Sequence, residues 1–321
     1  MPRKMVGQLG MLDAALSRRG QREEDALDRL GKLVAWDRFE VLLNGVHASR
    51  KGEASYPPLV MFKVLLLQRW HGLSDPGLEA ALRDRLSFMR FAGLSLDDPT
   101  PDHSTIWRFR DMLGRHGLVE HLMAELNGQL EGHGAFVKQG TLIDASLVIS
   151  AARRPKMSEG KISAVDPEAA FGTTNERGRY AFGYKLHVAV DAGSQLIRGL
   201  VVTPANLQEV SVAPRLLGCA EGVVYGDRGY DSDRLRALMA GRGLGDGLMR
   251  RRRGRELTAA EIERNHALSL SRRPVEAVFG TMKRSYRMGR MRAFSLARNA
   301  ADLTLFCMAF NLRRWLKLAT P

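Results

Sequence analysis

The stretch Thr141-Leu-Ile-Asp-Ala-Ser-Leu-Val-Ile149 decides the fold of this chain. It is apolar and β-branched, which predicts a buried strand. Two more strands are predicted at 184–190 and 195–202. The residues Asp191-Ala-Gly-Ser194 lie between them and are typical of a turn, so this pair is predicted to form a hairpin.

Helices and strands alternate after the hairpin. Helices are predicted over 210–217 and 232–239, with a short strand at 222–225 between them. Thr258-Ala-Ala-Glu261 has the form of a capping box and opens another helix. This alternation indicates an α/β domain whose mixed sheet is covered by helices on both faces.

Three other segments after residue 149 complete this half of the chain. The polar, glycine-rich stretch 150–179 is expected to be a mobile surface loop. A longer helix is expected to begin near Pro274, because proline is favoured in the first turn of a helix. The segment 302–317 is apolar on most sides and is expected to pack under the sheet.

The residues before the strand at 141 have helical periodicity only. Helices are predicted at 59–70, from Asp75 with its N-cap to about residue 91, and at 104–113. Short helices with a basic last member permit a helix-turn-helix contact with DNA, although a plain helical bundle with solvated arginines fits equally well. We expect an all-α N-terminal domain at 1–134 and an α/β domain at 135–321.

Composition points to a globular protein with a polyanionic partner. The 321 residues allow two domains, and 45% hydrophobic residues suffice for a real core, which excludes wholesale disorder. The net charge is +14. Residues 249–292 contain 13 lysines and arginines against 4 acidic residues, a surplus that can neutralise phosphates. A run such as Arg250-Arg-Arg-Arg-Gly-Arg255 is, however, usually only a solvated tract.

Several classes of function find no support. No apolar run approaches the roughly 20 residues that span a bilayer, and no secretory signal is recognised, so a cytoplasmic protein is expected. The two cysteines, Cys219 and Cys307, are interpreted as reduced thiols. The eight histidines have no zinc-binding spacing. Phosphate-binding Gly-Lys loops and dinucleotide fingerprints are absent, so no nucleotide cofactor is implied.

Three acidic residues stand out. Asp144 lies inside an apolar strand, where a carboxylate needs a bound cation, an arginine or another structural partner. Asp227 follows a strand at the edge where α/β sheets bind ligands, although it could instead make an Asx turn. Glu276 lies on a predicted helix and could equally belong to a solvated salt-bridge face. For capping the next helix, Asp231 and Asp233 are better candidates than Asp227.

Together the three acids suggest a metal site. Carboxylates from two strands and a helix can converge on a pair of Mg²⁺ ions, which prefer oxygen ligands. Two such ions about 3.5 to 4 Å apart activate a water or a 3′ hydroxyl and stabilise the leaving oxygen of a phosphodiester.

These motifs resemble those of a known enzyme family. The motifs are Thr141-Leu-Ile-Asp-Ala-Ser, Gly183-Tyr-Lys-Leu-His-Val-Ala-Val-Asp191, Thr203-Pro-Ala-Asn206, Tyr225-Gly-Asp-Arg-Gly-Tyr230, the spacing Arg272-(3)-Glu276-(6)-Lys283, and in the helical half Tyr56-Pro-Pro-Leu-Val-Met-Phe-Lys63 and Pro101-Asp-His-Ser-Thr-Ile-Trp-Arg-Phe-Arg110. In combination they resemble a DDE transposase of the insertion-sequence-five family, within the wider insertion-sequence-four-like group. The likeness extends over most of the chain from about residue 30.

The resemblance implies a fold and a set of catalytic groups. The fold would be a ribonuclease-H-like mixed sheet flanked by helices, and the acid triad would be Asp144, Asp227 and Glu276, holding two Mg²⁺ ions with Mn²⁺ able to substitute. Arg272 and Lys283 carry over from the motif. Ser269 stands where the wider group has a tyrosine, so any role of that tyrosine in a hairpin intermediate does not transfer.

The implied activity is cleavage at the ends of a mobile element and transfer of the 3′ hydroxyl into target DNA. The partners would be terminal inverted repeats, target DNA and further copies of the chain, at least a dimer on paired ends, on the nucleoid of a bacterial cytoplasm. We expect five residues to contact DNA: Arg272, Lys283, Arg284, Arg228 and Lys185. His187 is expected to be a partly exposed strand residue near DNA, and Asp191 a turn residue.

Two alternatives remain open at this point. A ribonuclease-H-like nuclease would cut DNA without joining it, and a transposase-derived regulator would bind DNA without catalysis. The intact set of three acids argues against the regulator, because a silent core has no chemical need for a costly buried aspartate.

Overall fold

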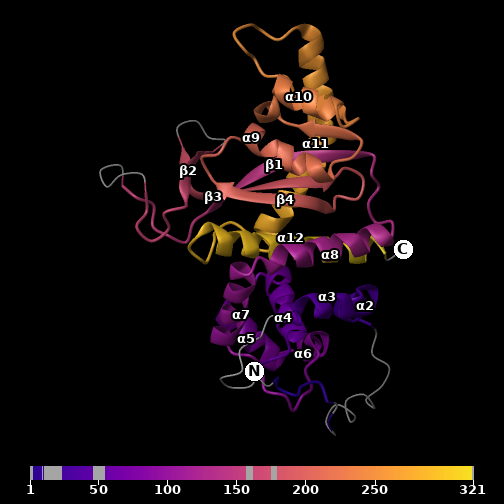
Figure 1. Cartoon of the computed structure of the whole chain (residues 1–321), viewed down its shortest axis with the longest axis vertical. Coiled ribbons are helices and arrows are strands. Elements are labelled where there is room, and N and C mark those ends of the chain that lie inside the picture. Colours follow the sequence, from indigo (N-terminus) through magenta and orange to yellow (C-terminus); the bar gives the residue numbers. More distant parts are fainter. Residues whose placement is uncertain are drawn as a thin grey trace. The chain divides into compact units, whose positions relative to one another are not determined.

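The chain divides into two compact units. The computed structural model describes residues 3–8, 10, 24–45, 55–156, 162–174 and 179–319. One unit contains Met1–Gly132 and Thr304–Pro321, and the other contains His133–Leu303. For the described residues, Figure 1 shows a helical first unit and a second unit with a sheet and helices.

The first unit is helical, as predicted. Its helices before residue 133 are α2 (Ala26–Leu33), α3 (Trp36–Leu43), α4 (Pro58–Trp70), α5 (Asp75–Asp84), α6 (Leu86–Ala92), α7 (His103–Arg115) and α8 (Leu118–Gly132). The helix expected from Asp75 to residue 91 is in fact two, because Arg85 adopts an extended conformation between α5 and α6. Its N-cap is Ser74 rather than Asp75, whose carboxylate instead accepts two hydrogen bonds from Arg110.

The C-terminal helix, α12 (Leu296–Leu318), contributes its later part to the helical unit. The Arg69 guanidinium lies 4.8 Å from the centre of the Phe306 ring, and Asn311 Nδ2 donates to Asn127 Oδ1 at 3.3 Å. These residues are grouped with the helical unit, so the expectation that 302–317 packs under the sheet stays a prediction for the residues after Leu303. Apolar faces predict burial of a helix but do not specify its partner.

The second unit is built on a mixed sheet. Its strands are β1 (Gly140–Ile149), β2 (Ala170–Thr173), β3 (Tyr180–Asp191), β4 (Ile197–Pro204), β5 (Val223–Gly226) and β6 (Gly245–Leu248). The order is β2-β3-β1-β5-β6, and β4 also pairs with β3. Strands β1 to β4 pair antiparallel, whereas β5 is parallel to both β1 and β6. The sequence prediction missed β6, a four-residue strand containing two glycines.

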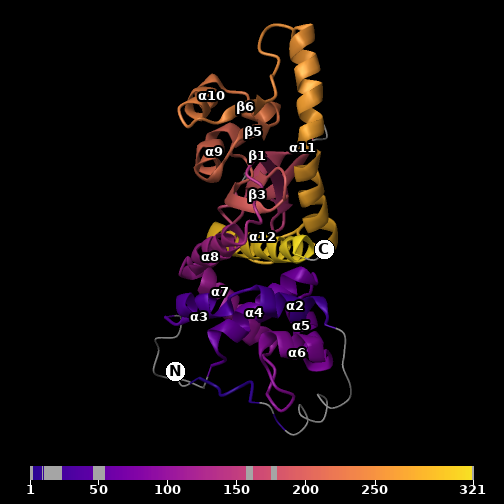
Figure 2. The same cartoon turned by 90° about the vertical axis from the view of Figure 1, so that its right-hand side faces the viewer.

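Helices cover both faces of this sheet, as predicted. Figure 2 shows α9 (Glu209–Leu216) and α10 (Asp233–Ala240) on one face and α11 (Ala259–Ser285) along the other. Val212 of α9 and Leu235 of α10 pack in a buried cluster with Ile143 of β1 and Val224 of β5. Apolar burial on this face holds the strands that carry the candidate acids.

The segment 150–179 is only partly the expected loop. It includes β2, and Asp166 is fully buried, accepting hydrogen bonds from Ser150 Oγ at 2.5 Å and from the Tyr184 hydroxyl. The expectation of a loop was therefore wrong for Ala170–Thr173, which form β2, and the contacts of Asp166 attach the loop before it to β3. Residues 157–161 and 175–178 of the expected loop lie outside the described residues.

Helix α11 corrects another expectation. Thr258 opens it with the predicted capping box, but no second helix begins at Pro274, because α11 continues through that residue. An interior proline removes one helical hydrogen bond and costs about 3 kcal/mol. Burial of Val275, Val278 and Met282 on the sheet side offsets that cost. Arg272 and Glu276 therefore lie on one continuous helix.

Within the ranges that the structure describes, no helix is both long enough and apolar enough to cross a bilayer.

Candidate active site

Asp144 and Asp227 lie on neighbouring strands at the same level. Strand β1 pairs with β5 in parallel, and Leu142 is the partner of Tyr225. Asp144 follows Leu142 by two residues within β1, and Asp227 follows Tyr225 by two residues, directly after β5. Residues two apart on a strand point to the same face, so Asp144 lies on the face that carries Leu142. Asp227 is near enough to raise the pKa of Asp144. The structure thus brings two of the predicted acids together.

Asp144 has an arginine partner. Its Oδ2 accepts a hydrogen bond from Arg272 Nη2 at 3.1 Å, and its Oδ1 accepts one from the Ala145 N–H at 2.8 Å. Burial raises the pKa of Asp144 to about 7; Arg272 and the Ala145 N–H oppose this rise, while the neighbouring Asp227 and Glu209 add to it. An arginine partner for Asp144 was one of the alternatives predicted from the sequence, and Arg272 is that partner. Arg272 does not fully offset the cost of burying the Asp144 charge, because the pKa of Asp144 remains raised.

Asp227 makes the turn that was foreseen as its alternative role. Its Oδ1 accepts a hydrogen bond from the Gly229 N–H at 2.8 Å and caps the short 3-10 helix η3 (Arg228–Tyr230). The expectation that Asp231 or Asp233 caps the next helix was wrong, because Ser232 caps α10. The turn fixes the backbone of Asp227 directly after β5.

A third acid of this cluster, Glu209, was missed by sequence reasoning. It is the first residue of α9. A Cβ placed on Gly229 would lie 2.7 Å from Glu209 Oε2 and 3.0 Å from Asp227 Oδ1, so the two carboxylates face each other across this glycine. Burial raises the pKa of Glu209, and Asp227 adds to the rise. The only feature of the sequence that could have indicated a role for Glu209 is its position soon after the motif Thr203-Pro-Ala-Asn206. This indication is weak, because acidic residues are common in the first turn of any helix.

Glu276 is placed differently from the other acids. It is exposed on α11, one turn beyond Arg272 and on the same helix face. Within the described residues, no three acidic, histidine or cysteine side chains are gathered closely enough to hold a metal ion. A metal shared by Asp144, Asp227 and Glu276 therefore stays a prediction.

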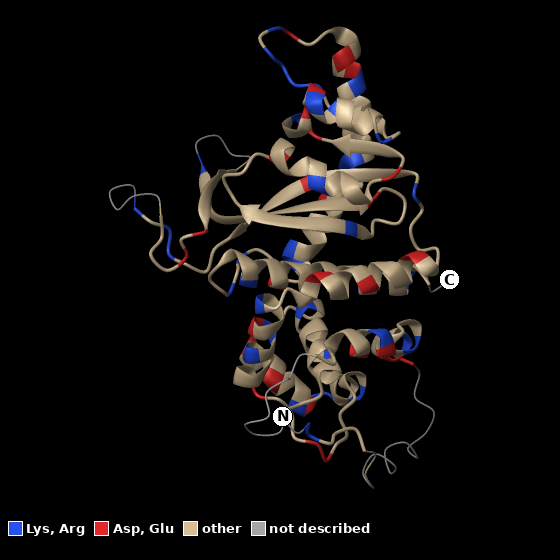
Figure 3. Cartoon of the chain, viewed as in Figure 1, with Lys and Arg blue, Asp and Glu red and all other residues tan. Residues whose placement is uncertain are grey.

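The residues expected to contact DNA differ in exposure. Arg228, Lys283 and Arg284 are exposed, whereas Arg272 is 8% exposed and bonded to Asp144. Lys185 Nζ donates to Glu209 Oε1 at 3.3 Å and to the Leu207 carbonyl at 3.0 Å. Figure 3 shows basic residues along the β6–α11 connection. The DNA contacts of all five residues stay predictions.

His187 corrects one expectation and Asp191 confirms another. The His187 side chain is fully buried, its Nε2 lies 3.0 Å from Thr203 Oγ1, and burial lowers its pKa to about 3. It is a core residue rather than a partly exposed one, because it lies on the same face of β3 as Ala189, which packs against Val212 of α9. Asp191 organises the hairpin turn by accepting hydrogen bonds from the Ser194 N–H and hydroxyl. Cys219 and Cys307 are free thiols, as expected.

Sequence comparison agrees with this geometry. Residues 135–312 match the family described as Transposase DDE domain, which is more than half of the chain, and residues 15–112 match Transposase domain (DUF772). The chain belongs to the DDE transposases. Both matches fit the type shared by the insertion-sequence-five and insertion-sequence-four groups, and the ribonuclease-H-like fold class is confirmed. No solved structure matches the chain.

DDE transposases are metal-dependent enzymes that act on DNA. The donor groups of this transposase suit a divalent ion in kind, since carboxylate oxygens are what Mg²⁺ prefers. The site also contains an unsatisfied polar group: the Tyr230 hydroxyl is fully buried without a hydrogen-bond partner, and its electrostatic neighbours are Glu209, Asp144 and Asp227. Crowded acids beside an unpartnered hydroxyl are a setting that a bound cation would stabilise.

Proposed function

We propose that this transposase cuts DNA at the ends of its element with Mg²⁺ and transfers the freed 3′ hydroxyl into target DNA. The proposed catalytic acids are Asp144, Asp227 and Glu276. The observation that carries the proposal is the side-by-side placement of Asp144 and Asp227, with Arg272 reaching Asp144 from the helix that bears Glu276.

Each residue has a distinct proposed task. Asp144 and Asp227 would hold two Mg²⁺ ions, or Mn²⁺ in their place, and Glu276 would join them from α11. When bound, these ions activate the attacking hydroxyl or water and stabilise the leaving oxygen. Arg272 orients Asp144 through its 3.1 Å hydrogen bond and partly offsets the charge of the acids. Strand β1 and the hydrogen-bonded turn after β5 would hold the two aspartates at fixed positions relative to the bond that is cut.

Contacts with the DNA backbone are proposed for the basic residues around these acids. Lys283 and Arg284 lie in the last turn of α11, and Arg228 lies on the turn after Asp227. Their charges would bind phosphates, giving an affinity that falls with salt and carries no sequence information. Lys185 and Arg272, now engaged with acids, would bind phosphate only after those acids have bound metal.

The partners of this activity follow from its chemistry. We propose residues 1–134 as the helical domain for DNA binding or oligomerisation and 135–321 as the catalytic domain. Two element ends must be held together, which favours a homo-oligomer, at least a dimer. Its DNA would be the terminal inverted repeats of the element and a target site, which would keep the protein on the nucleoid of a bacterial cytoplasm.

The test is incubation with Mg²⁺ and a labelled terminal-repeat duplex, together with target plasmid. The repeats are found by sequencing the DNA on both sides of the gene. Joined products are expected from the transposase. Nicks without joining would replace the proposal by a nuclease. A salt-sensitive gel shift without any cleavage would replace it by a DNA-binding regulator.

A further inference from the structure

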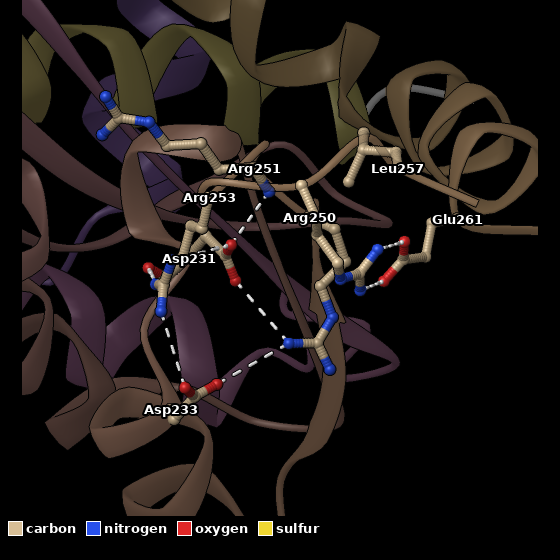
Figure 4. Close-up of a pocket in the computed structure, with 8 residues that line it drawn as sticks. Asp231, Asp233, Arg250, Arg251, Arg253, Leu257 and Glu261 are labelled. Atoms are coloured by element: carbon tan, nitrogen blue, oxygen red, sulfur yellow. Dashed lines mark hydrogen bonds and ion pairs between the residues drawn. The ribbon is translucent and has the colours of Figure 1, made fainter.

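The connection between β6 and α11 forms an arginine-rich pocket. It has a volume of about 260 Å³ and includes Arg250, Arg253 and Arg255 in its lining. Figure 4 shows the Arg250 and Arg253 side chains directed toward Asp231 and Asp233. Arg255 forms an ion pair with Glu261. The pocket therefore combines four arginines with three acids of different exposure.

Asp231 anchors the arginine loop. Its side chain is only 3% exposed, and it accepts hydrogen bonds from the Arg251 N–H at 2.8 Å and from Arg236 Nη1 at 2.5 Å. Its carbonyl accepts another from Arg253 Nη2. Although burial opposes it, these bonds hold the pKa of Asp231 below its usual range. Asp231 is thus a structural anion that fixes the loop backbone.

Asp233 is held loosely between the same arginines. Its side chain is 79% exposed, and its oxygens lie 3.7 Å from Arg250 Nη1 and 3.5 Å from Arg253 Nη1. Charge-assisted hydrogen bonds are shorter, about 2.7 to 2.9 Å. Exposed ion pairs of this kind contribute at most about 1 kcal/mol. Water and a competing anion can therefore displace this carboxylate at little cost.

The remaining charges leave the pocket cationic. Arg255 is satisfied by Glu261 through two hydrogen bonds of 2.7 and 2.9 Å. The Asp231 carboxylate is already hydrogen-bonded by Arg236, which largely neutralises its charge. Arg250 Nη1 and Arg253 Nε lie farther from its oxygens, at 3.8 and 3.5 Å. Arg250 and Arg253 thus present a pair of guanidinium groups whose exposed counter-ion is Asp233.

We propose that this pocket is a phosphate-binding site for the backbone of bound DNA, in which a phosphate takes the place of the Asp233 carboxylate between Arg250 and Arg253. The inference rests on the proposed action on DNA and adds a contact surface to it. Guanidinium groups match phosphate oxygens in geometry and charge. Asp231 follows Asp227 across the short helix η3, so a strand bound here is anchored on the same turn as a candidate catalytic acid.

The test uses two neighbouring acids with opposite expected effects. Binding of a labelled duplex is measured by fluorescence anisotropy against salt, in EDTA, for the wild type, Asp233→Asn and Asp231→Asn. Asp233→Asn removes a competing anion and is expected to tighten binding about 2- to 5-fold. Asp231→Asn also removes a negative charge, yet it releases the loop and is expected to weaken binding. Arg253→Ala is expected to weaken binding and lower the salt slope by about one.

The matched control is Glu263→Gln, which makes the same charge change at an exposed position of α11 outside the pocket lining. Equal tightening by Asp233→Asn and Glu263→Gln would overturn the proposal, because only overall charge would then matter. Tightening by Asp231→Asn would overturn it as well. Thermal unfolding of each variant shows whether it is folded, and Arg253→Ala supplies a second test if Asp231→Asn is not.

A competition experiment with inorganic phosphate distinguishes a site for the DNA backbone from a site for free phosphate. Phosphate is expected to compete with DNA for the wild type and less well for Arg253→Ala. Competition by phosphate without any change of DNA affinity among the variants would mean a small-anion site and would overturn the DNA contact. These measurements contain no metal and require no cleavage. The binding measurements can therefore contradict the phosphate site even if strand transfer is observed. They can also support the phosphate site even if strand transfer is not observed.

Discussion

Asp144 within β1 and Asp227 directly after β5 each lie two residues beyond the paired Leu142 and Tyr225 of these adjacent parallel strands. Backbone pairing between β1 and β5 sets their spacing before any metal binds. Such preorganisation matters because the protein then pays little conformational entropy to gather like charges. The resulting repulsion is offset in part by Arg272, whose Nη2 donates to Asp144.

Replacing Asp227 by Asn is expected to remove cleavage while leaving DNA binding nearly intact. Asparagine can still accept the Gly229 N–H bond that forms the turn, but it is a poor ligand for Mg²⁺. Mutating a residue that only hydrogen-bonds to a metal ligand typically lowers metal affinity or activity about 10- to 100-fold. Loss of the ligand itself should therefore lower the cleavage rate by more than about 100-fold. Cleavage of the labelled duplex measures this, with Glu263→Gln as control. Retained activity would mean that another acid holds the metal.

The stability of the metal-free protein is expected to fall as pH rises from about 4 to about 7. Because burial raises the pKa of Asp144 to about 7, its protonated form is favoured in the folded state. Its contribution is full below the unfolded pKa and is lost as pH passes the folded pKa, with a slope of up to about 1.4 kcal/mol per pH unit. The free energy of unfolding is measured by urea titration in EDTA for the wild type and for Asp144→Asn at several pH values. The difference between the two proteins isolates the contribution of Asp144. A pH-independent difference contradicts the prediction.

Gly229→Ala is expected to impair metal binding without unfolding the protein. The new Cβ would meet the ends of two flexible side chains, at 2.7 Å from Glu209 Oε2 and 3.0 Å from Asp227 Oδ1, and would push the carboxylates apart. We expect a 10- to 100-fold loss of Mn²⁺ affinity and of cleavage. Gly218→Ala is the control, because nothing lies within 4 Å of a Cβ there. Unaltered Mn²⁺ affinity would show that Glu209 and Asp227 do not act together.

Lys283→Ala is expected to weaken DNA binding and to lower its salt dependence by about one unit of slope. Lys283 lies exposed near the end of α11, beyond Glu276 on that helix. Anisotropy titrations at several salt concentrations provide the measurement. An unchanged slope would place Lys283 on a solvated face with no phosphate contact.

Local sequence patterns predicted much of the fold. The apolar run around Asp144, the Asp191 turn and the Thr258 capping box each depend on neighbours along the chain, and each is present. Continuity of α11 through Pro274 was not predictable from local rules, because proline favours a helix start. Burial of that helix against the sheet decided the outcome.

Sequence patterns were enough to single out the candidate acids, because a carboxylate inside an apolar strand is costly wherever that strand packs. Which of these acids lie close together depends on the folded chain. The register of β1 against β5 aligned Asp144 with Asp227, the packing of α9 brought Glu209 to Gly229, and the path of the β6–α11 connection placed Arg251 and its neighbours against Asp231. These are contacts between residues far apart in the chain, and they arise from strand pairing and shared burial, which no local pattern contains.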